Sequence, residues 1–230
     1  MTYEELLDAY QPLGILDEQK VSLLKRYAEL LLEANAKFNL TAIKEIPEIV
    51  EKHFYDCLLP LKEFDLKGKK ILDVGSGGGF PGLVFAIALP ESQLTLLDAT
   101  AKKCVFLKET AEALGLKNVH VVNSRAEDFD MRNCFDVVTG RAVAAMPKLL
   151  EITAPFAKVN GSVLLMKALK GNEELSESQN AIKVLNLKLE KTQQEKMPNG
   201  EERLNFLFVK KDKTLRKYPR SWKEIMAKPL

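Results

Sequence analysis

The stretch that decides the fold is Ile71-Leu-Asp-Val-Gly-Ser-Gly-Gly-Gly-Phe-Pro-Gly82. Its first four residues are mainly apolar, which is typical of a buried strand. The glycines that follow permit positive φ angles and let the backbone approach a ligand closely. We expect a helix after this turn, with free N–H groups facing a pocket. A strand, a glycine turn and a helix in this order form the place where an α/β fold receives a nucleoside cofactor.

The spacing of the glycines separates two classes of cofactor. A dinucleotide fingerprint, Gly-x-Gly-x-x-Gly, needs a third glycine where this chain has Phe80. Asp73 stands two residues before Gly75, and glycines then alternate at 75, 77 and 79. This arrangement resembles motif I of the S-adenosylmethionine-dependent methyltransferases and argues against NAD. The turn residues expected at the S-adenosylmethionine are Gly75, Ser76 and Gly77.

Length and composition predict a soluble globular protein. The 230 residues are 46% hydrophobic and 29% charged, and no apolar run approaches the roughly 18 residues of a membrane span. The acidic start, Met1-Thr-Tyr-Glu-Glu, differs from a secretory signal. Three widely spaced cysteines are best interpreted as small, reduced core residues and not as a disulfide or metal site. We expect a cytoplasmic monomer without a membrane segment or a bound metal.

Positive charge is concentrated at the C-terminal end. The net charge of the whole chain is +2, whereas residues 210–230 carry +6 and residues 1–209 carry −4. Basic residues interleaved with Tyr218 and Trp222 suit phosphate contacts and stacking on unpaired bases. A solvated, partly frayed terminus is an equally common reason for such a run. The basic candidates are Lys210, Lys211, Lys213, Arg216, Lys217 and Arg220.

Periodicity predicts helices first and then strands alternating with helices. Thr2 and Asp17 mark the starts of two helices, and Pro47 opens a third whose apolar stripe includes His53. A histidine in such a stripe is more often a core residue than a functional one. The expected strands are 70–74, 93–97, 118–123, 134–139, 161–167, 184–190 and 203–210. The expected helices of this part lie near 80–90, 101–115, 143–157 and 172–183.

The last two strands are expected to pair as a hairpin, because Pro198-Asn-Gly200 between them is a turn and no helix fits there. The predicted fold is therefore α/β and Rossmann-like, of the S-adenosylmethionine-dependent methyltransferase type. Its seven-stranded sheet is mostly parallel and ends in an antiparallel hairpin. The expected organisation is an N-terminal helical extension over 1–66, a methyltransferase domain over 67–211 and a basic tail over 212–230.

Polar residues at the carboxyl ends of the strands are candidates for the pocket. Asp98 ends the second strand, where its carboxylate is placed to accept hydrogen bonds from ribose hydroxyls. Ser124-Arg-Ala-Glu-Asp128 follows the third strand and is within reach of an adenine edge, although helix capping explains it equally well. Arg141 follows the fourth strand, where it orients the cofactor, grips nucleic acid or is simply a surface cation.

Two absent motifs narrow the chemistry. The fourth strand is not followed by the Asp/Asn-Pro-Pro-aromatic turn of exocyclic amine methylation, and no Pro-Cys nucleophile is present for attack at pyrimidine carbon. A ring nitrogen with an exposed lone pair, such as guanine N7, needs only alignment and exclusion of water. The sequence fits that simpler demand, without a covalent intermediate.

The chain resembles, over nearly its whole length, the bacterial guanine-N7 methyltransferases of small-subunit (16S) ribosomal RNA, also called glucose-inhibited division protein B. The resemblance rests on the glycine turn and on five further motifs. These are Phe38-Asn39-Leu-Thr-Ala-Ile43, Lys52-His-Phe-Tyr-Asp-Cys-Leu58, Leu96-Leu-Asp-Ala-Thr-Ala-Lys-Lys103, Ser124-Arg-Ala-Glu127 and Gly140-Arg-Ala142. The chain departs from the family at Ala99, where a serine is frequent, and over 221–227 of the tail.

The resemblance implies a site and a mechanism. An unstacked loop guanosine of small-subunit ribosomal RNA, free or in the small ribosomal subunit, presents N7 in line with the methyl group. The implied donor-pocket residues are Gly75, Phe80, Asp98, Ala126, Glu127 and Arg141. The implied catalytic residues are Arg141, Asn39 and His53. The implied RNA-face residues are Asn39, His53, Arg125, Lys167 and Arg203, to which the tail adds Arg220.

Three other functions share parts of this pattern. A methyltransferase acting on a small molecule would keep the donor pocket without needing a basic tail. A non-catalytic RNA-binding assembly factor would keep the fold as a scaffold, since a fold does not prove activity. An NAD-dependent oxidoreductase is disfavoured by the missing third glycine and by the closing hairpin.

Overall fold

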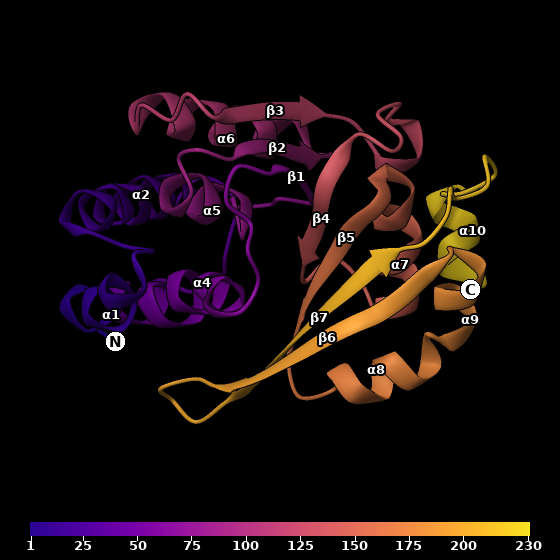
Figure 1. The fold of residues 1–230 in the computed structure, drawn as a ribbon. Coiled ribbons are helices and arrows are strands. Elements are labelled where there is room, and N and C mark those ends of the chain that lie inside the picture. The colour runs from indigo at the N-terminus through magenta and orange to yellow at the C-terminus, as the bar shows by residue number, and fades with distance from the viewer.

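Seven strands form one sheet in the order β3-β2-β1-β4-β5-β7-β6, as a computed structural model of residues 1–230 shows (Figure 1). The strands β3, β2, β1, β4 and β5 run parallel, and β7 runs antiparallel to both β5 and β6. This confirms the predicted mostly parallel sheet with a closing hairpin. The strands are β1 (Lys70–Val74), β2 (Gln93–Asp98), β3 (Val119–Asn123), β4 (Phe135–Arg141), β5 (Ala157–Lys167), β6 (Leu187–Lys196) and β7 (Glu202–Lys210).

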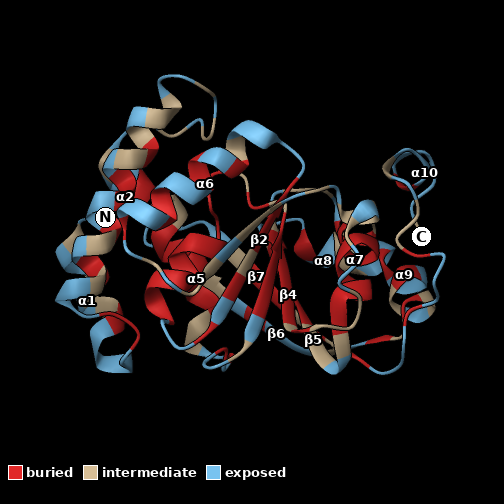
Figure 2. Cartoon of the chain, turned by 90° about the horizontal axis from the view of Figure 1, so that it is seen from above, coloured by how far each residue is buried: buried red, intermediate tan, exposed pale blue.

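Helices cover both faces of the sheet (Figure 2). The N-terminal helices pack with α5 and α6 on one face, and α7, α9 and α10 pack on the other. Central strands such as β1 bury both faces, so successive residues Ile71 and Leu72 belong to different cores. The helices are α1 (Tyr3–Tyr10), α2 (Glu18–Asn35), α3 (Ile46–Ile49), α4 (Asp56–Leu58), α5 (Gly82–Ala88), α6 (Ala101–Ala113), α7 (Met146–Thr153), α8 (Gly171–Glu177), α9 (Gln179–Val184) and α10 (Trp222–Ala227). None of them combines the length and the apolar character needed to cross a lipid bilayer.

Several element bounds differ from the predicted ones. The sixth strand was expected at 184–190, whereas β6 spans Leu187–Lys196. Val184 ends α9 and Leu185 is buried against the second core, so their apolar character belongs to the helix layer. The polar residues at the end of β6 still pair with β7, because the pairing is made by the backbone and an antiparallel edge strand can expose polar side chains to solvent. The helix expected near 172–183 is divided into α8 and α9 at Ser178.

The third predicted helix is a continuous but irregular helical run. It begins with α3 and continues through a π-helical turn over Val50–Tyr55, the short α4 and a 3₁₀ turn over Leu59–Lys62. His53 lies in the π-helical turn. Such wide turns cost regular hydrogen bonding and occur often at functional sites.

The turn after β1 is closed by a buried carboxylate. The N–H of Gly82, the first residue of α5, donates to Asp73 Oδ2 at 3.0 Å. The expectation that the N–H groups of this helix are free is therefore wrong at its first residue, because Asp73 occupies that position. Burial raises the pKa of the Asp73 carboxyl to about 7.

The C-terminal tail is folded against the sheet and is not frayed. Tyr218 and Ile225 are buried in the second core, beside α7. The expectation that Lys210 contacts phosphate is wrong, because this side chain is 0% exposed. It ends β7, and its Nζ donates to Asn133 Oδ1 and to backbone carbonyls. Of the six basic candidates of the tail, Lys211, Lys213, Arg216 and Lys217 remain exposed.

Packing requires a glycine at position 82, which gives a first prediction. A Cβ there would lie 2.1 Å from Leu96 Cδ2 and 2.7 Å from Asp73 Oδ2. We expect Gly82→Ala to lower the free energy of unfolding by roughly 1–3 kcal/mol, the usual cost of overpacking, as measured by urea denaturation. Leu96→Val removes the overlapping methyl, so the same glycine change should cost less in that background. Strictly additive effects of the two changes would contradict this explanation.

Candidate functional site

Two clefts adjoin where the carboxyl ends of the central strands meet, at the point where the strand order reverses between β1 and β4. Val143 belongs to both clefts. We call the first the glycine-turn cleft; it has a volume of about 180 Å³ and is lined by Val74, Gly75, Leu97, Asp98, Ala99, Ser124, Arg125, Ala126, Glu127, Val143, Ile152 and Trp222. We call the second the polar cleft; it has a volume of about 550 Å³ and is lined by Lys52, His53, Asp56, Arg141–Ala145, Met166–Ala168, Glu174 and Arg203.

Backbone geometry shapes the glycine-turn cleft. Gly75 has a φ of +74°, and a Cβ at this position would lie 2.7 Å from Val143 Cγ2. Asp98 ends β2 with one carboxylate oxygen accepting from the N–H of Gly77 at 2.9 Å and the other from Thr100 at 2.8 Å. Each oxygen can accept a second hydrogen bond. The carboxylate is therefore held in place at the cleft and still able to bind a pair of hydroxyl groups.

The other turn residues support the cleft without lining it. The Ser76 hydroxyl donates to the carbonyl of Asp73 at 3.0 Å and is buried. Gly77 acts through its N–H, which orients Asp98. Phe80 is 6% exposed and lies beneath the polar cleft, where the His53 ring stacks on it with centroids 4.2 Å apart.

The segment after β3 forms one wall of the glycine-turn cleft. Ala126 and Glu127 begin a 3₁₀ turn and line the cleft. Glu127 Oε1 accepts from the backbone N–H of Trp222 at 3.2 Å. Arg125 also lines the cleft and forms a long ion pair with Glu127 Oε1 at 3.8 Å; because its side chain is 60% exposed, it can also contact a partner in solvent.

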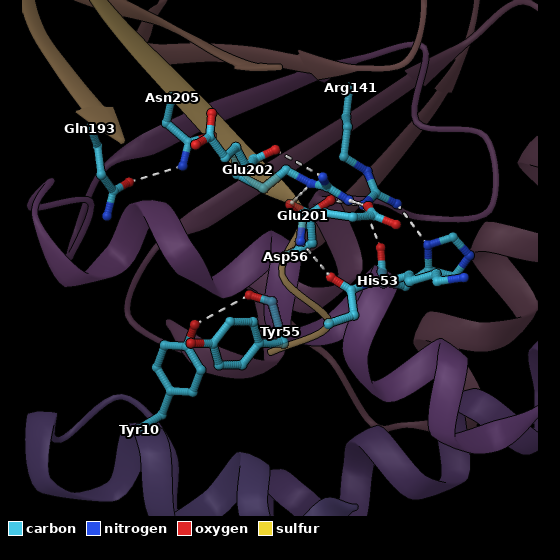
Figure 3. A network of polar contacts seen from close by, with 12 residues as sticks. Tyr10, His53, Tyr55, Asp56, Arg141, Gln193, Glu201, Glu202 and Asn205 are labelled. Atoms are coloured by element: carbon cyan, nitrogen blue, oxygen red, sulfur yellow. Dashed lines mark hydrogen bonds and ion pairs between the residues drawn. The ribbon is translucent and has the colours of Figure 1, made fainter. Parts of the chain in front are cut away.

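A buried ion network fixes the polar cleft (Figure 3). Asp56, 7% exposed, accepts from Arg141 at 2.8 Å through one oxygen and from Arg203 at 3.1 Å through the other. Arg141 also donates to the Lys52 carbonyl at 3.2 Å and to His53 Nδ1 at 3.0 Å. Its guanidinium lies 5.1 Å from the centroid of the Phe80 ring. The guanidinium is therefore held between a carboxylate, a carbonyl, an imidazole and an aromatic ring.

His53 is held neutral and in one tautomer. A guanidinium can only donate, so Nδ1 accepts from Arg141 and Nε2 carries the proton. Nε2 lies 2.8 Å from Thr41 Oγ1, to which it donates. Burial, together with the charge of Arg141, lowers the pKa of His53 to about 3. Both ring nitrogens are engaged, which suits positioning better than proton transfer.

The remaining predicted site residues divide into two groups. Lys167 and Arg203 line the polar cleft, where Lys167 pairs with Glu174 at 2.8 Å. Asn39 is exposed and lies in a neighbouring hollow that is linked to His53 only through Thr41. Arg220 lies outside both clefts and pairs with Glu151 at 2.6 Å, a carboxylate whose side chain is 0% exposed.

Sequence reasoning missed two residues of this region. Asp56 is the centre of the ion network, and the signal for it was an acid inside the apolar stripe of a helix, which requires a cationic partner when buried. Trp222 lines the glycine-turn cleft, whereas the sequence suggested only stacking on RNA bases. No local pattern marks that position, because the tail reaches the cleft through tertiary packing.

Known proteins resemble this chain in both sequence and fold. Residues 20–204 match the GidB family, described as rRNA small subunit methyltransferase G. The chain is 40% identical over 238 residues to the ribosomal RNA small subunit methyltransferase G of Leuconostoc citreum, with 100% of both chains covered. It is 43% identical over 227 residues to the protein of the same name from Lactococcus lactis, covering 96% of this chain and 95% of the other. A SAM dependent methyltransferase structure from Aquifex aeolicus shares the fold, with a TM-score of 0.54 and 21% identity over 71% of this chain and 94% of that chain.

The depressed pKa of His53 predicts a pH effect on stability. The imidazole has an ordinary pKa near 6.5 when unfolded and about 3 when folded, so the unfolded state binds the proton first as the pH falls. Stability from the neutral ring is complete above pH 6.5 and is lost toward pH 3, at up to about 1.4 kcal/mol per pH unit. Asn at position 53 keeps an acceptor but does not titrate. Urea unfolding at pH 4.5, 5.5 and 7.5 should therefore show wild type losing stability relative to His53→Asn; a constant difference would contradict the assignment.

Proposed function

This chain belongs to the rRNA small subunit methyltransferase G family, and we propose that it transfers the methyl group of S-adenosylmethionine to N7 of a loop guanosine in small-subunit (16S) ribosomal RNA. The observation that carries the proposal is the pair of adjoining clefts at the strand-order reversal. One contains Gly75 of the glycine turn and Asp98 at the end of β2, and the other is lined mainly by charged side chains. Val143 is the wall common to both, so a donor and an acceptor in the two clefts meet beside it.

The glycine-turn cleft fits the donor. Gly75 lines the cleft and packs so closely on Val143 that a Cβ would not fit, and the carboxylate of Asp98 is proposed to accept from the ribose hydroxyls. Ala126 and Glu127 line the same cleft and are proposed to contact the adenine. When bound, S-adenosylmethionine supplies a methyl group activated by the positive charge on its sulfur. The residues around it have to bind, orient and exclude water.

The polar cleft suits a methyl acceptor whose attacking atom already carries a free lone pair. Guanine N7 carries no proton, so transfer needs no general base, and the doubly engaged, neutral His53 agrees with that demand. Arg141 and His53 are proposed to position the base through a rigid network anchored on Asp56. Four cationic side chains and two carboxylates line this cleft, and the excess of positive charge favours nucleic acid.

An unpaired guanosine is the form of substrate that the clefts accept. Side chains read single-stranded RNA loops readily and paired RNA poorly, and a base must leave its stack to reach an enclosed pocket. Arg125 and Asn39 are exposed beside the two clefts and are proposed to contact the flanking RNA. Lys167 and Arg203 are proposed to contact the RNA at the polar cleft, although both also hold carboxylates.

The proposal is tested by methyl transfer to small ribosomal subunits that lack their own modification. Radiolabelled methyl from S-adenosylmethionine should appear in the RNA as N7-methylguanosine. Arg141→Ala should reduce transfer at least a hundredfold, because the network that positions the acceptor is lost, while circular dichroism shows a folded chain. Arg26→Ala is the matched control, since that arginine forms only an exposed ion pair on α2.

The outcomes of this assay separate the competing functions. Donor binding without label in RNA would favour a small-molecule acceptor, and absence of donor binding would favour a scaffold. Full transfer by a folded Arg141→Ala variant would remove this residue from the site.

The exposed tail cations are expected to contribute to RNA affinity. Replacing Lys211, Lys213 and Arg216 by Gln removes three exposed charges and leaves the buried anchors Tyr218 and Ile225 in place. If each of them meets a phosphate, the slope of log K against log salt should flatten by about 2. The measurement is RNA binding by fluorescence anisotropy across a salt series.

A matched control keeps the total charge change the same. Lys67, Lys117 and Lys188 are exposed and scattered over loops and an edge strand, so their replacement by Gln should leave the slope close to that of wild type. Equal flattening in both triple variants would assign the effect to net charge alone. No flattening in either would leave the tail as a structural element only.

A further inference from the structure

The C-terminal helix brings an aromatic side chain to the glycine-turn cleft. Trp222 is the first residue of α10 and lines this cleft together with Asp98, Ala126 and Glu127. It is half-buried and packs on the second core. In Figure 1, α10 is the yellow helix beside α7, well separated in sequence from the strands whose ends form the cleft. Trp222 is also the one tryptophan of the chain.

Anchors on both sides of Trp222 fix its position. The backbone N–H of Trp222 donates to Glu127 Oε1 at 3.2 Å, and this hydrogen bond connects α10 to the wall of the cleft. Two residues earlier, Arg220 donates to the buried Glu151 through Nε at 2.8 Å and through its backbone N–H at 3.0 Å. Three residues later, Ile225 is 0% exposed. The tryptophan is therefore a built part of the cleft.

We propose that the indole of Trp222 stacks on the purine ring of the bound methyl donor and sets the affinity for it. The inference rests on the proposed function. Asp98, at the end of β2, is the group suited to the ribose, and the segment after β3 lies next along the sheet. The base therefore extends toward Ala126 and Glu127, where Trp222 stands. A purine offers a flat face to an aromatic ring, and such stacking is a substantial source of nucleoside affinity.

The same contact couples the donor to the tail. A donor that stacks on Trp222 binds only when α10 is docked, so donor binding stabilises the docked tail and a docked tail strengthens donor binding. Glu127 takes part in both, since it lines the cleft and accepts the Trp222 N–H. The basic residues 211–217 lead directly into this segment, which places RNA-facing charge and donor affinity on one piece of chain.

Fluorescence tests the proposal directly, because the chain has a single tryptophan. Titration with S-adenosylmethionine, S-adenosylhomocysteine or adenosine should quench or shift the emission, whereas methionine alone should not. Calorimetry in parallel reports binding independently of the indole. Binding seen by calorimetry with unchanged emission would overturn the inference and leave the proposed function standing. No binding by either measurement would overturn both.

Variants give the second readout. Trp222→Ala should weaken donor binding by roughly tenfold or more and raise the KM for the donor with little change in kcat at saturation. Trp222→Phe keeps a stacking face and should restore most of the affinity. Met226→Ala is the matched control, because Met226 lies on the same helix and is 47% exposed. Equal donor affinity in wild type and in a Trp222→Ala variant with an unchanged melting temperature would overturn the inference, and so would a Trp222→Phe variant as weak as Trp222→Ala.

Discussion

The site depends on one buried carboxylate. Asp56 comes from the N-terminal helical layer, Arg141 from the end of β4 and Arg203 from β7, and the three meet in a single ion network. Removing these charges from water is costly, and leaving one unpaired costs more than the pair gains. The network is therefore a weak source of stability and a strict constraint on geometry. The network connects the helical layer to the carboxyl edge of the sheet. Arg141 in turn donates to His53, whose ring stacks on Phe80.

A second constraint acts along the glycine turn. Asp73 holds the first N–H of α5, and the close packing of Gly82 on Leu96 brings the helix against the strand. The turn that joins β1 to α5 must reverse the chain direction within a few residues. Gly75, which packs on Val143, has the positive φ that this reversal requires. Since Val143 follows β4, the turn that shapes the glycine-turn cleft also fixes the wall that this cleft shares with the polar cleft. The shapes of the two clefts are thus set by the same few contacts.

Much of this was accessible from the sequence, and the reason is local. The strand–turn–helix pattern around Gly75, the acid at the end of β2 and the Pro198–Gly200 turn are each encoded within a few residues, so the sheet and the glycine-turn cleft followed from them. What failed depended on distant packing. Lys210 looked like a tail cation, yet it ends a strand and is surrounded by carbonyls from the β4–β5 region. The role of Asp56 and the π-helical turn around His53 depend on partners far along the chain.

The chemistry proposed for the clefts agrees with the full engagement of their polar groups. A reaction that needs a general base requires a side chain with a free lone pair and a pKa near neutrality. Here His53 is occupied on both nitrogens, and Arg141 is occupied by a carboxylate, a carbonyl and an imidazole. Side chains engaged in this way transfer protons poorly, but they keep the geometry of the cleft fixed. A nitrogen acceptor with its own lone pair needs only that shape, so the rigidity of the network is itself the feature that fits transfer by positioning.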